Sequence, residues 1–134
     1  MKGIYLLVIK VNKDLKLKVG SLGKIDFKKG IYIYVGSAQN SLKKRIKRHK
    51  LKKKKIFWHI DYLLDNKFSK IIKIFYKKAD KSQECEVAKK LIKYGIPIDH
   101  FGSSDCKCKS HLIKIKELKI IDKLNFKNIY ENSN

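Results

Sequence analysis

The chain has 134 residues, the length of one domain, and 43% of them are apolar, which is enough for a folded core. It carries 34 basic and 12 acidic residues, a net charge of +22, so a polyanion is the expected partner. Nucleic acid fits better than a membrane, because no apolar run approaches the ~20 residues of a spanning helix. There is no signal-peptide cleavage site and the three cysteines are an odd number, so we expect a cytoplasmic protein whose thiols are reduced or bind metal.

The first half of the chain predicts several strands and one helix. Apolar and β-branched residues predict buried strands over 3–11 and 30–36, and alternation with period two predicts a half-exposed strand over 15–19 that pairs with 25–28. Asn40 or Ser41 is the expected N-cap of a helix whose inward stripe is Leu42, Ile46 and His49.

The second half predicts a helix over 56–64, a strand over 71–76, a helix over 82–94 and a strand over 111–115. The polar segment 99–110 is an expected loop, and the Lys-rich residues 116–134 are an expected helix or tail. No repeat or linker divides the chain. We therefore predict a single α+β domain over 1–134, with a small central antiparallel or mixed sheet flanked by helices.

Arginine use singles out one helix. Of the 34 basic residues, the only two arginines are Arg45 and Arg48, three positions apart. Arginine differs from lysine by a planar fork that binds phosphate through two hydrogen bonds. Two arginines in one helical turn of an otherwise Lys-only chain suggest a phosphate site there.

Three motifs in order carry a family resemblance. GIY stands at 3–5, YVG at 34–36, and a helix with Arg45 follows within the string YVGSAQNSLKKRIKRH. This order and spacing resemble the GIY-YIG nuclease superfamily over roughly residues 2–115. The strings WHIDYL at 58–63, EC at 84–85 and SSDCKCKSHL at 103–112 are similar to a largely archaeal branch of unassigned function.

The resemblance implies a set of catalytic residues. Tyr5 and Tyr34 would be neighbours in the sheet, and one of them would position or deprotonate the attacking water, helped by positive charge because a free tyrosine has a pKa near ~10. Arg45 would clamp the scissile phosphate. His49, on the same helix face, would be a proton donor or phosphate ligand, and His59 is expected to face the site.

The resemblance also implies one divalent metal ion, Mg²⁺ or Mn²⁺, held by a glutamate. The family position of that glutamate falls near Ala88, so Glu84, one helical turn earlier on the same face, is the expected ligand and Glu86 is the alternative. The family asparagine that follows a proline has no match. Asp99, His100 or Asp105 could stand in its place.

Nucleic-acid contacts are expected along the basic residues between 43 and 55, which we call the Lys43–Lys55 ridge. Two residues of the polar loop, Ser104 and Asp105, are expected branch-specific contacts to substrate or metal. The expected contacts on the ridge itself are Lys44, Lys47, Arg48, Lys52, Lys53 and Lys54.

The cysteine-rich loop offers metal-like chemistry without a standard spacing. A Cys-x-Cys with a histidine three residues later lacks the paired knuckles of a zinc ribbon, so a structural zinc at Cys106, Cys108 and His111 is not the favoured interpretation, even with Cys85 as a fourth ligand. The alternative is that hydrogen bonds close this loop over the site.

Two functions compete on this sequence. The first is a metal-dependent endonuclease that cuts DNA, including structured or damaged DNA in repair. The alternative is a non-catalytic nucleic-acid-binding module that kept the nuclease fold, and the shifted glutamate favours it. DNA is the favoured partner, and an RNA-directed protein is a third hypothesis.

Overall fold

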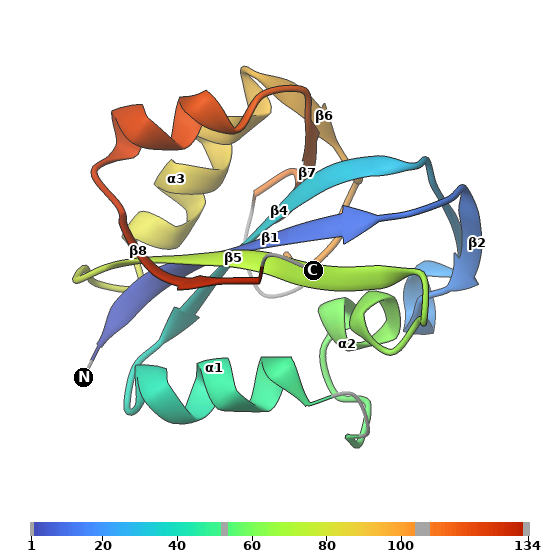
Figure 1. Cartoon of the computed structure of the whole chain (residues 1–134), viewed down its shortest axis with the longest axis horizontal. Helices are drawn as coiled ribbons and strands as arrows, with labels where there is room; N and C mark the ends of the chain where they lie inside the picture. Colours follow the sequence, from blue (N-terminus) through green and yellow to red (C-terminus); the bar gives the residue numbers. More distant parts are fainter. Residues whose placement is uncertain (1, 52–53, 104–107, 133–134) are drawn as a thin grey trace.

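The protein, in a computed structural model that describes residues 2–51, 54–103 and 108–132, is an α+β domain, as the sequence predicted. Its main sheet has six strands, all paired antiparallel, in the order β6-β7-β4-β1-β5-β8, and a separate hairpin joins β2 to β3 (Figure 1). The elements in chain order are β1 (Gly3–Val11), β2 (Leu15–Lys18), the 3-10 turn η1 (Gly20–Leu22), β3 (Lys24–Phe27), β4 (Gly30–Ala38), α1 (Leu42–Lys50), α2 (His59–Leu64), β5 (Ser69–Lys77), α3 (Gln83–Ile92), β6 (Gly95–Pro97), β7 (Leu112–Ile115), the 3-10 helix η2 (Leu118–Leu124) and β8 (Lys127–Glu131).

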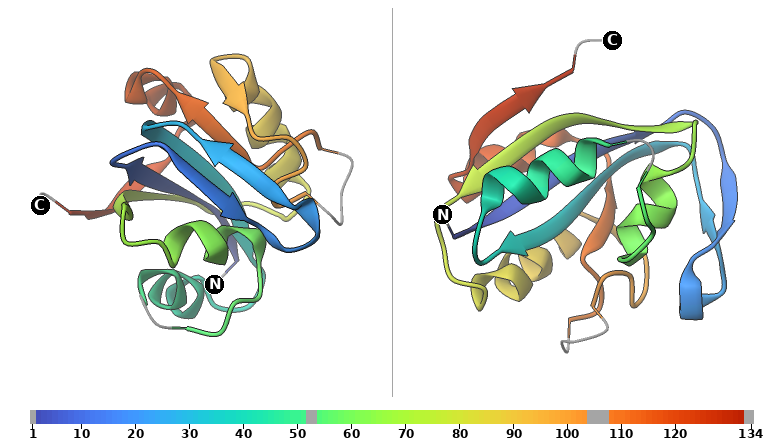
Figure 2. Two further views of the ribbon diagram at one scale, coloured as in Figure 1. Left: turned by 90° about the vertical axis from the view of Figure 1, so that its right-hand side faces the viewer. Right: turned by 90° about the horizontal axis from the view of Figure 1, so that it is seen from below.

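Strand β1 is buried on both faces because the sheet lies between two helical layers. Its odd-numbered side chains from Tyr5 to Val11 pack toward α1 and α2, and its even-numbered side chains from Ile4 to Val8 pack toward α3 and η2. Figure 2 shows α1 and α2 together on one face of the sheet. This double burial explains why residues 3–11 form a nearly continuous apolar run.

Helix α1 begins and packs as its sequence predicted. Ser41 is the N-cap, and its Oγ accepts a hydrogen bond from the Lys44 amide at 3.2 Å. Leu42, Ile46 and His49 form the buried stripe, so the helix has a fixed rotation on the sheet. Arg45, in the turn between these residues, is thereby placed at the rim of the sheet.

One glycine is required by the close approach of a ring. Gly36 on β4 lies opposite Tyr5 on β1 in the antiparallel register. A Cβ on Gly36 would lie 2.6 Å from Tyr5 Cε2, a distance that real Cβ atoms do not show. The absence of a side chain at position 36 therefore lets the Tyr5 ring lie across β4.

The structure departs from the sequence prediction mainly at edges and ends. The segment after 116, expected as a helix or tail, forms η2 and then β8, which pairs with β5. The predicted helix 56–64 begins only at His59. Residues 95–97, expected only to end a helix, form the edge strand β6. Among the described residues, none of the helices has both the length and the apolar character needed to span a bilayer.

Candidate active site

A cavity of about 500 Å³ lies beside the end of β4, where none of the described residues forms a strand pair with the outer edge of β4. β7 pairs with β4 only from Ile31 to Tyr34, so the part of β4 from Gly36 onward is open to residues of both helical layers. Side chains of α1, α2 and α3 meet there. The cavity is lined by Tyr5, Tyr34, Gly36, Ser37, Gln39, Asn40, Ser41, Arg45, Phe57, Trp58, His59, Lys81, Glu84 and Gly102.

Five of the predicted site residues line this one cavity: Tyr5, Tyr34, Arg45, His59 and Glu84. They come from five different elements or their ends, and 79 positions separate the first from the last. The fold brings them together because β1 and β4 are neighbours and the N-termini of α2 and α3 both point to the open edge of β4. This convergence places two phenols, a guanidinium, an imidazole and a carboxylate around one cavity.

His49 stands behind the cavity wall. Its Nε2 shares a hydrogen bond of 2.7 Å with the Tyr5 hydroxyl, and its ring is 2% exposed. Burial lowers the pKa of His49 to about 3, so its imidazole is neutral at neutral pH. Within the described part of the chain, its Nδ1 has no hydrogen-bond partner.

The two tyrosines are phenols at neutral pH. Burial raises the pKa of Tyr5 above its usual range, and the charge and hydrogen bond of Arg45 offset only part of that effect. Burial likewise raises the pKa of Tyr34, and the neighbouring Tyr5 adds to the increase. The expectation that positive charge would favour the phenolate is therefore wrong: desolvation is the larger effect.

Arg45 is held in place by protein contacts. One guanidinium nitrogen, Nη1, donates a hydrogen bond of 3.0 Å to the Ser37 carbonyl. The guanidinium lies over the Trp58 ring, with Cζ 4.5 Å from the ring centroid. These contacts orient the planar group at the cavity wall and reduce the entropy that a phosphate clamp would otherwise lose on binding.

Arg48, an expected nucleic-acid contact, is engaged by neighbouring protein groups. Its guanidinium donates to both carboxylate oxygens of the buried Asp61, at 3.0 and 2.8 Å, and to the Lys55 carbonyl at 3.0 Å. The Arg48 guanidinium also lies against the Trp58 ring, with its Cζ 4.3 Å from the ring centroid. The two parallel hydrogen bonds from the Arg48 guanidinium to Asp61 connect α1 to the first turn of α2.

His59 contributes one nitrogen to the cavity side. Its Nδ1 accepts a hydrogen bond of 2.9 Å from the Gly102 amide, and its ring packs edge-on against Phe101. Burial lowers the pKa of His59, so the neutral ring carries its proton on Nε2. His59, which lines the cavity, therefore has Nε2 as its hydrogen-bond donor.

The two candidate glutamates differ in position. Glu84 lines the cavity from the first turn of α3, whereas Glu86 is exposed to solvent and is not a lining residue. Glu84 Oε1 also lies 3.1 Å from Nδ1 of the buried His111, which fixes the carboxylate. Asp99 and His100 are exposed and do not line the cavity, and Asp105 lies outside the described residues.

Comparison of the sequence with known protein families identifies one family for this chain. A model of a domain of unknown function, DUF123, matches residues 4–132. The chain belongs to the DUF123 family. No curated protein and no solved structure matches it.

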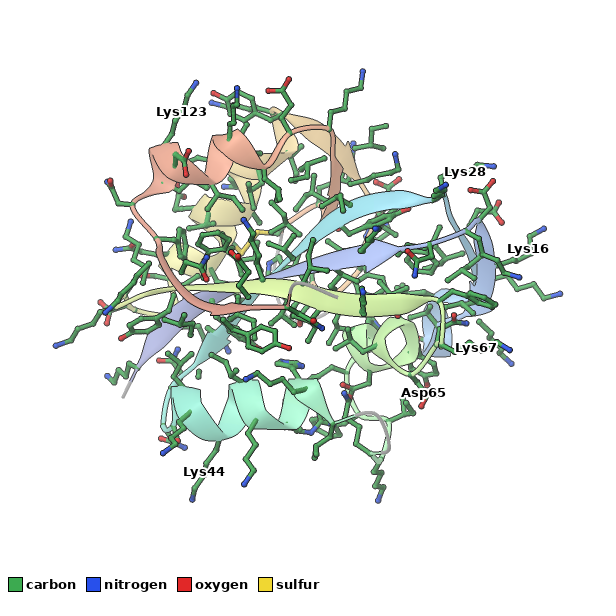
Figure 3. The ribbon with its side chains drawn as sticks, in the orientation of Figure 1. Lys16, Lys28, Lys44, Asp65, Lys67 and Lys123 are labelled. Carbon is green, nitrogen blue, oxygen red and sulfur yellow. A yellow bond between two sulfur atoms is a disulfide. The ribbon has the colours of Figure 1, made fainter. Side chains whose placement is uncertain are left out.

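The basic ridge of this DUF123 chain is only partly directed to solvent. Lys44 and Lys47 are exposed on the outer face of α1, and Figure 3 shows Lys44 pointing away from the sheet. Lys54 instead donates to the His49 and Leu51 carbonyls at 3.1 and 2.8 Å, where it caps the C-terminus of α1. Lys52 and Lys53 lie outside the described residues. Lysines also project from other sides of the molecule, among them Lys16, Lys28 and Lys123.

Three of the four residues that the sequence offered as possible metal ligands lie together in the structure. Cys85 on α3, Cys108 and His111 have their sulfur and nitrogen atoms within 4.8 Å of one another, which makes the cluster able to hold a metal ion. Cys85 and Cys108 are in disulfide contact. Cys106 and Ser104 lie outside the described residues.

Three residues that the sequence did not single out shape the DUF123 site. Asp61 is fully buried and also accepts hydrogen bonds from the Phe57 and Trp58 amides, both at 2.9 Å. Phe57 lines the cavity while 75% exposed. Gln39 Nε2 is buried in the cavity wall without a partner among the described residues. The exposure of Phe57 and the burial of Asp61 depend on tertiary packing, which the local sequence does not encode. The one feature that could have indicated a special role is the aspartate within the apolar string WHIDYL.

The lining of the cavity is compatible with a hard divalent cation such as Mg²⁺ or Mn²⁺, because it includes a carboxylate. Glu84 is the one carboxylate among the described lining residues. Magnesium is commonly bound by one or two carboxylates together with water and substrate phosphate.

Proposed function

We propose that this DUF123 protein is a metal-dependent endonuclease of the GIY-YIG type that hydrolyses phosphodiester bonds in DNA. The observation that carries the proposal is the convergence of Tyr5, Tyr34, Arg45 and Glu84 on one cavity. Each supplies something that phosphodiester hydrolysis needs: an oriented water, a clamp for negative charge and a metal ligand. Structured or damaged DNA is the proposed substrate class, because an open-edged cavity admits a backbone that departs from a regular duplex.

Arg45 is the proposed phosphate clamp. Negative charge grows on the non-bridging oxygens as the water attacks, and a fixed guanidinium placed before the reaction stabilises that charge without reorganisation. Lys81 lines the same cavity and adds positive charge. The unpartnered Gln39 amide offers a further hydrogen-bond donor to a phosphate oxygen.

Tyr5 and His49 are the proposed route for the proton of the attacking water. The raised pKa keeps Tyr5 protonated, so its hydroxyl acts by passing a proton along a hydrogen bond instead of as a free phenolate. His49 Nε2, 2.7 Å away, is the neutral acceptor. A bound phosphate would raise the low pKa of His49, because nearby negative charge favours the imidazolium.

The remaining residues complete the reaction. A divalent ion bound at Glu84 would lower the pKa of a water and offset phosphate charge. His59 donates from Nε2 and is suited to hydrogen-bond the leaving oxygen as the phosphorus–oxygen bond breaks. Tyr34 lines the cavity and, as a phenol, would donate a hydrogen bond to the water or to the phosphate.

The charge of the chain supports nucleic acid as partner. A net charge of +22 favours binding to a phosphate backbone, and such binding weakens steeply with salt as condensed ions are released. Lys44 and Lys47 are exposed on α1, the helix that carries Arg45, and would contact flanking phosphates. DNA is preferred over RNA in the proposal because the resemblance is to DNA nucleases.

A non-catalytic nucleic-acid-binding module is the second candidate. The observation that favours it is the poverty of acidic groups, with Glu84 the one carboxylate among the described lining residues. If that carboxylate does not retain a metal ion at cellular concentrations, the same cavity binds a phosphate without cutting it. DNA or RNA would then bind with the same dependence on salt.

Cleavage assays on a substrate panel separate the two functions. Nicked, branched, abasic and intact duplex DNA, and a matched RNA, would be incubated with the protein and Mg²⁺, Mn²⁺ or a chelator. The endonuclease predicts cleavage of at least one DNA that the chelator abolishes. Salt-sensitive binding of all substrates without cleavage in either metal would support the binding module instead.

A further inference from the structure

A second constellation of metal-ligating groups lies behind the cavity. Cys85 in the first turn of α3, Cys108, and His111 just before β7 place two sulfurs and one imidazole nitrogen within 4.8 Å of one another. Cys85 Sγ is 3.7 Å from His111 Nε2. Cys108 and His111 are buried, at 6% and 1% exposure. Cys85 is partly buried, so two sulfurs and an imidazole from two distant segments of the chain share one largely enclosed position.

The histidine of this cluster is oriented by a carboxylate. Glu84 Oε1 lies 3.1 Å from His111 Nδ1, on the side of the ring away from the sulfurs. When Nδ1 donates to a carboxylate, the neutral ring presents the lone pair of Nε2 to the opposite side. Histidines that bind metals usually have such a carboxylate or carbonyl partner, which fixes the tautomer and strengthens the ligand.

We propose that Cys85, Cys108 and His111 bind one zinc ion in the reduced protein. Two thiols lose their protons to solvent as the ion binds, and the two thiolates balance the charge of Zn²⁺ beside a neutral imidazole. Thiolate and imidazole ligands select zinc over the magnesium or manganese assigned to the cavity, because those ions prefer oxygen. The three donors leave one tetrahedral position for a water or another ligand.

The site would act on the cavity through a single side chain. His111 would be held by zinc at Nε2 and would hold Glu84 at Nδ1, and Glu84 lines the cavity from the same helix that carries Cys85. His111 is then a positioning residue for the carboxylate. This part of the inference rests on the proposed endonuclease function, whereas zinc binding itself does not.

The metal content of the reduced protein tests the site directly. The chain would be equilibrated with Zn²⁺ under reductant, passed through a desalting column and weighed by native mass spectrometry, and Co²⁺ would replace zinc for absorption spectroscopy. We expect one zinc per chain and thiolate-to-cobalt charge-transfer absorption. Absence of bound zinc in the reduced parent, or a Cys85–Cys108 disulfide that persists in reductant, would overturn the proposal.

Variants assign the ligands and their orienting partner. Cys85→Ser, Cys108→Ser and His111→Asn should each lose the zinc, whereas His100→Asn, an exposed histidine, should retain it. Glu84→Gln should weaken zinc binding by about 10- to 100-fold, as expected for loss of a histidine's carboxylate partner, and Glu86→Gln should not. Equal zinc affinity in Glu84→Gln and the parent would show that Glu84 does not orient His111, and the zinc site would then have no connection to the cavity.

The failure of this inference and of the proposed function are distinguishable, because mass spectrometry needs no cleavage. A zinc-loaded protein that cuts no substrate leaves the zinc site standing. If the protein is active, removal of zinc should shift the magnesium dependence of cleavage to higher concentration, and added zinc should restore it. An unchanged magnesium dependence would contradict the positioning role of His111.

Discussion

The Tyr5 hydroxyl and His49 Nε2 lie 2.7 Å apart although 44 positions separate them in the sequence. The first residue comes from the central strand β1 and the second from the inward stripe of α1. Tyr5 lines the cavity, and His49 is the neutral, buried group behind it. This pair connects the cavity to an imidazole that is only 2% exposed.

The burial of His49 predicts a pH-dependent stability. With a folded pKa of about 3 and an ordinary value of 6.5, its contribution is complete above pH 6.5 and is lost as the pH falls toward 3, because only the unfolded chain takes up the proton. The free energy of unfolding should fall by up to about 1.4 kcal/mol per pH unit from this group. His49→Gln, which does not titrate, should show a shallower slope in urea unfolding between about pH 4.5 and 7. Parallel slopes for the parent and the variant would contradict the assignment.

The Arg48–Asp61 pair predicts a large and local loss of stability. Asp61 is fully buried, and Asp61→Asn would leave the Arg48 guanidinium without its counter-charge, at an expected cost of about 3–5 kcal/mol in the free energy of unfolding. Asp65→Asn, an exposed residue at the end of α2, is the matched control and should change the free energy by less than about 0.5 kcal/mol. Similar denaturation midpoints for the two variants would mean that the pair has little energetic role.

Much of the fold followed from the sequence, and the reason is visible in particular elements. The apolar runs of β1 and β4 and the Ser41-capped stripe of α1 report directly on burial. Strands β6 and β8 lie at the two edges of the sheet, where pairing to one neighbour requires no apolar pattern. Their sequences therefore resemble those of turns or tails.

The sequence singled out residues that line the cavity, but it did not predict their contacts or the direction of their pKa shifts. The motif order singled out Tyr5, Tyr34 and Arg45, and helical spacing from the family position at Ala88 favoured Glu84 over Glu86; Tyr5, Tyr34, Arg45 and Glu84 line the same cavity. The engagement of Arg48 by Asp61 and of Lys54 by backbone carbonyls depends on how the segment after α1 folds back, and local spacing does not encode this. The raised pKa values of the tyrosines likewise depend on desolvation by distant residues.

Arg45→Lys should separate the stabilisation of the scissile phosphate during cleavage from the general electrostatic attraction of DNA. Lysine keeps the positive charge and loses the planar fork, so the affinity for DNA should change little while the rate of cleavage falls by about 10²–10³-fold. Single-turnover cleavage and binding with a chelator present measure the two effects separately. A variant that cleaves like the parent would reduce Arg45 to an ordinary backbone contact.

Phe57 should provide a stacking platform for an unpaired base. It lines the cavity at 75% exposure and contacts the Trp58 ring edge-on, 5.2 Å between centroids. Phe57→Ala should weaken binding of branched or single-stranded DNA by about 1–3 kcal/mol, and Phe57→Trp should restore it. Tyr94→Ala, which removes another exposed ring away from the cavity, is the control. Equal losses in both alanine variants would point to a non-specific effect.

The central claim is that Glu84 makes the cavity a metal-dependent phosphodiesterase site. Glu84→Gln keeps the shape of the side chain and removes the charge that a hard divalent cation needs, while Glu86→Gln makes the same change on the exposed side of α3. The most direct measurement is single-turnover cleavage of the preferred DNA by the parent and both variants across a range of Mg²⁺ and Mn²⁺ concentrations. The account predicts that Glu84→Gln loses metal-dependent cleavage and still binds DNA, with Glu86→Gln equal to the parent. Full activity in Glu84→Gln, or loss only in Glu86→Gln, would contradict it.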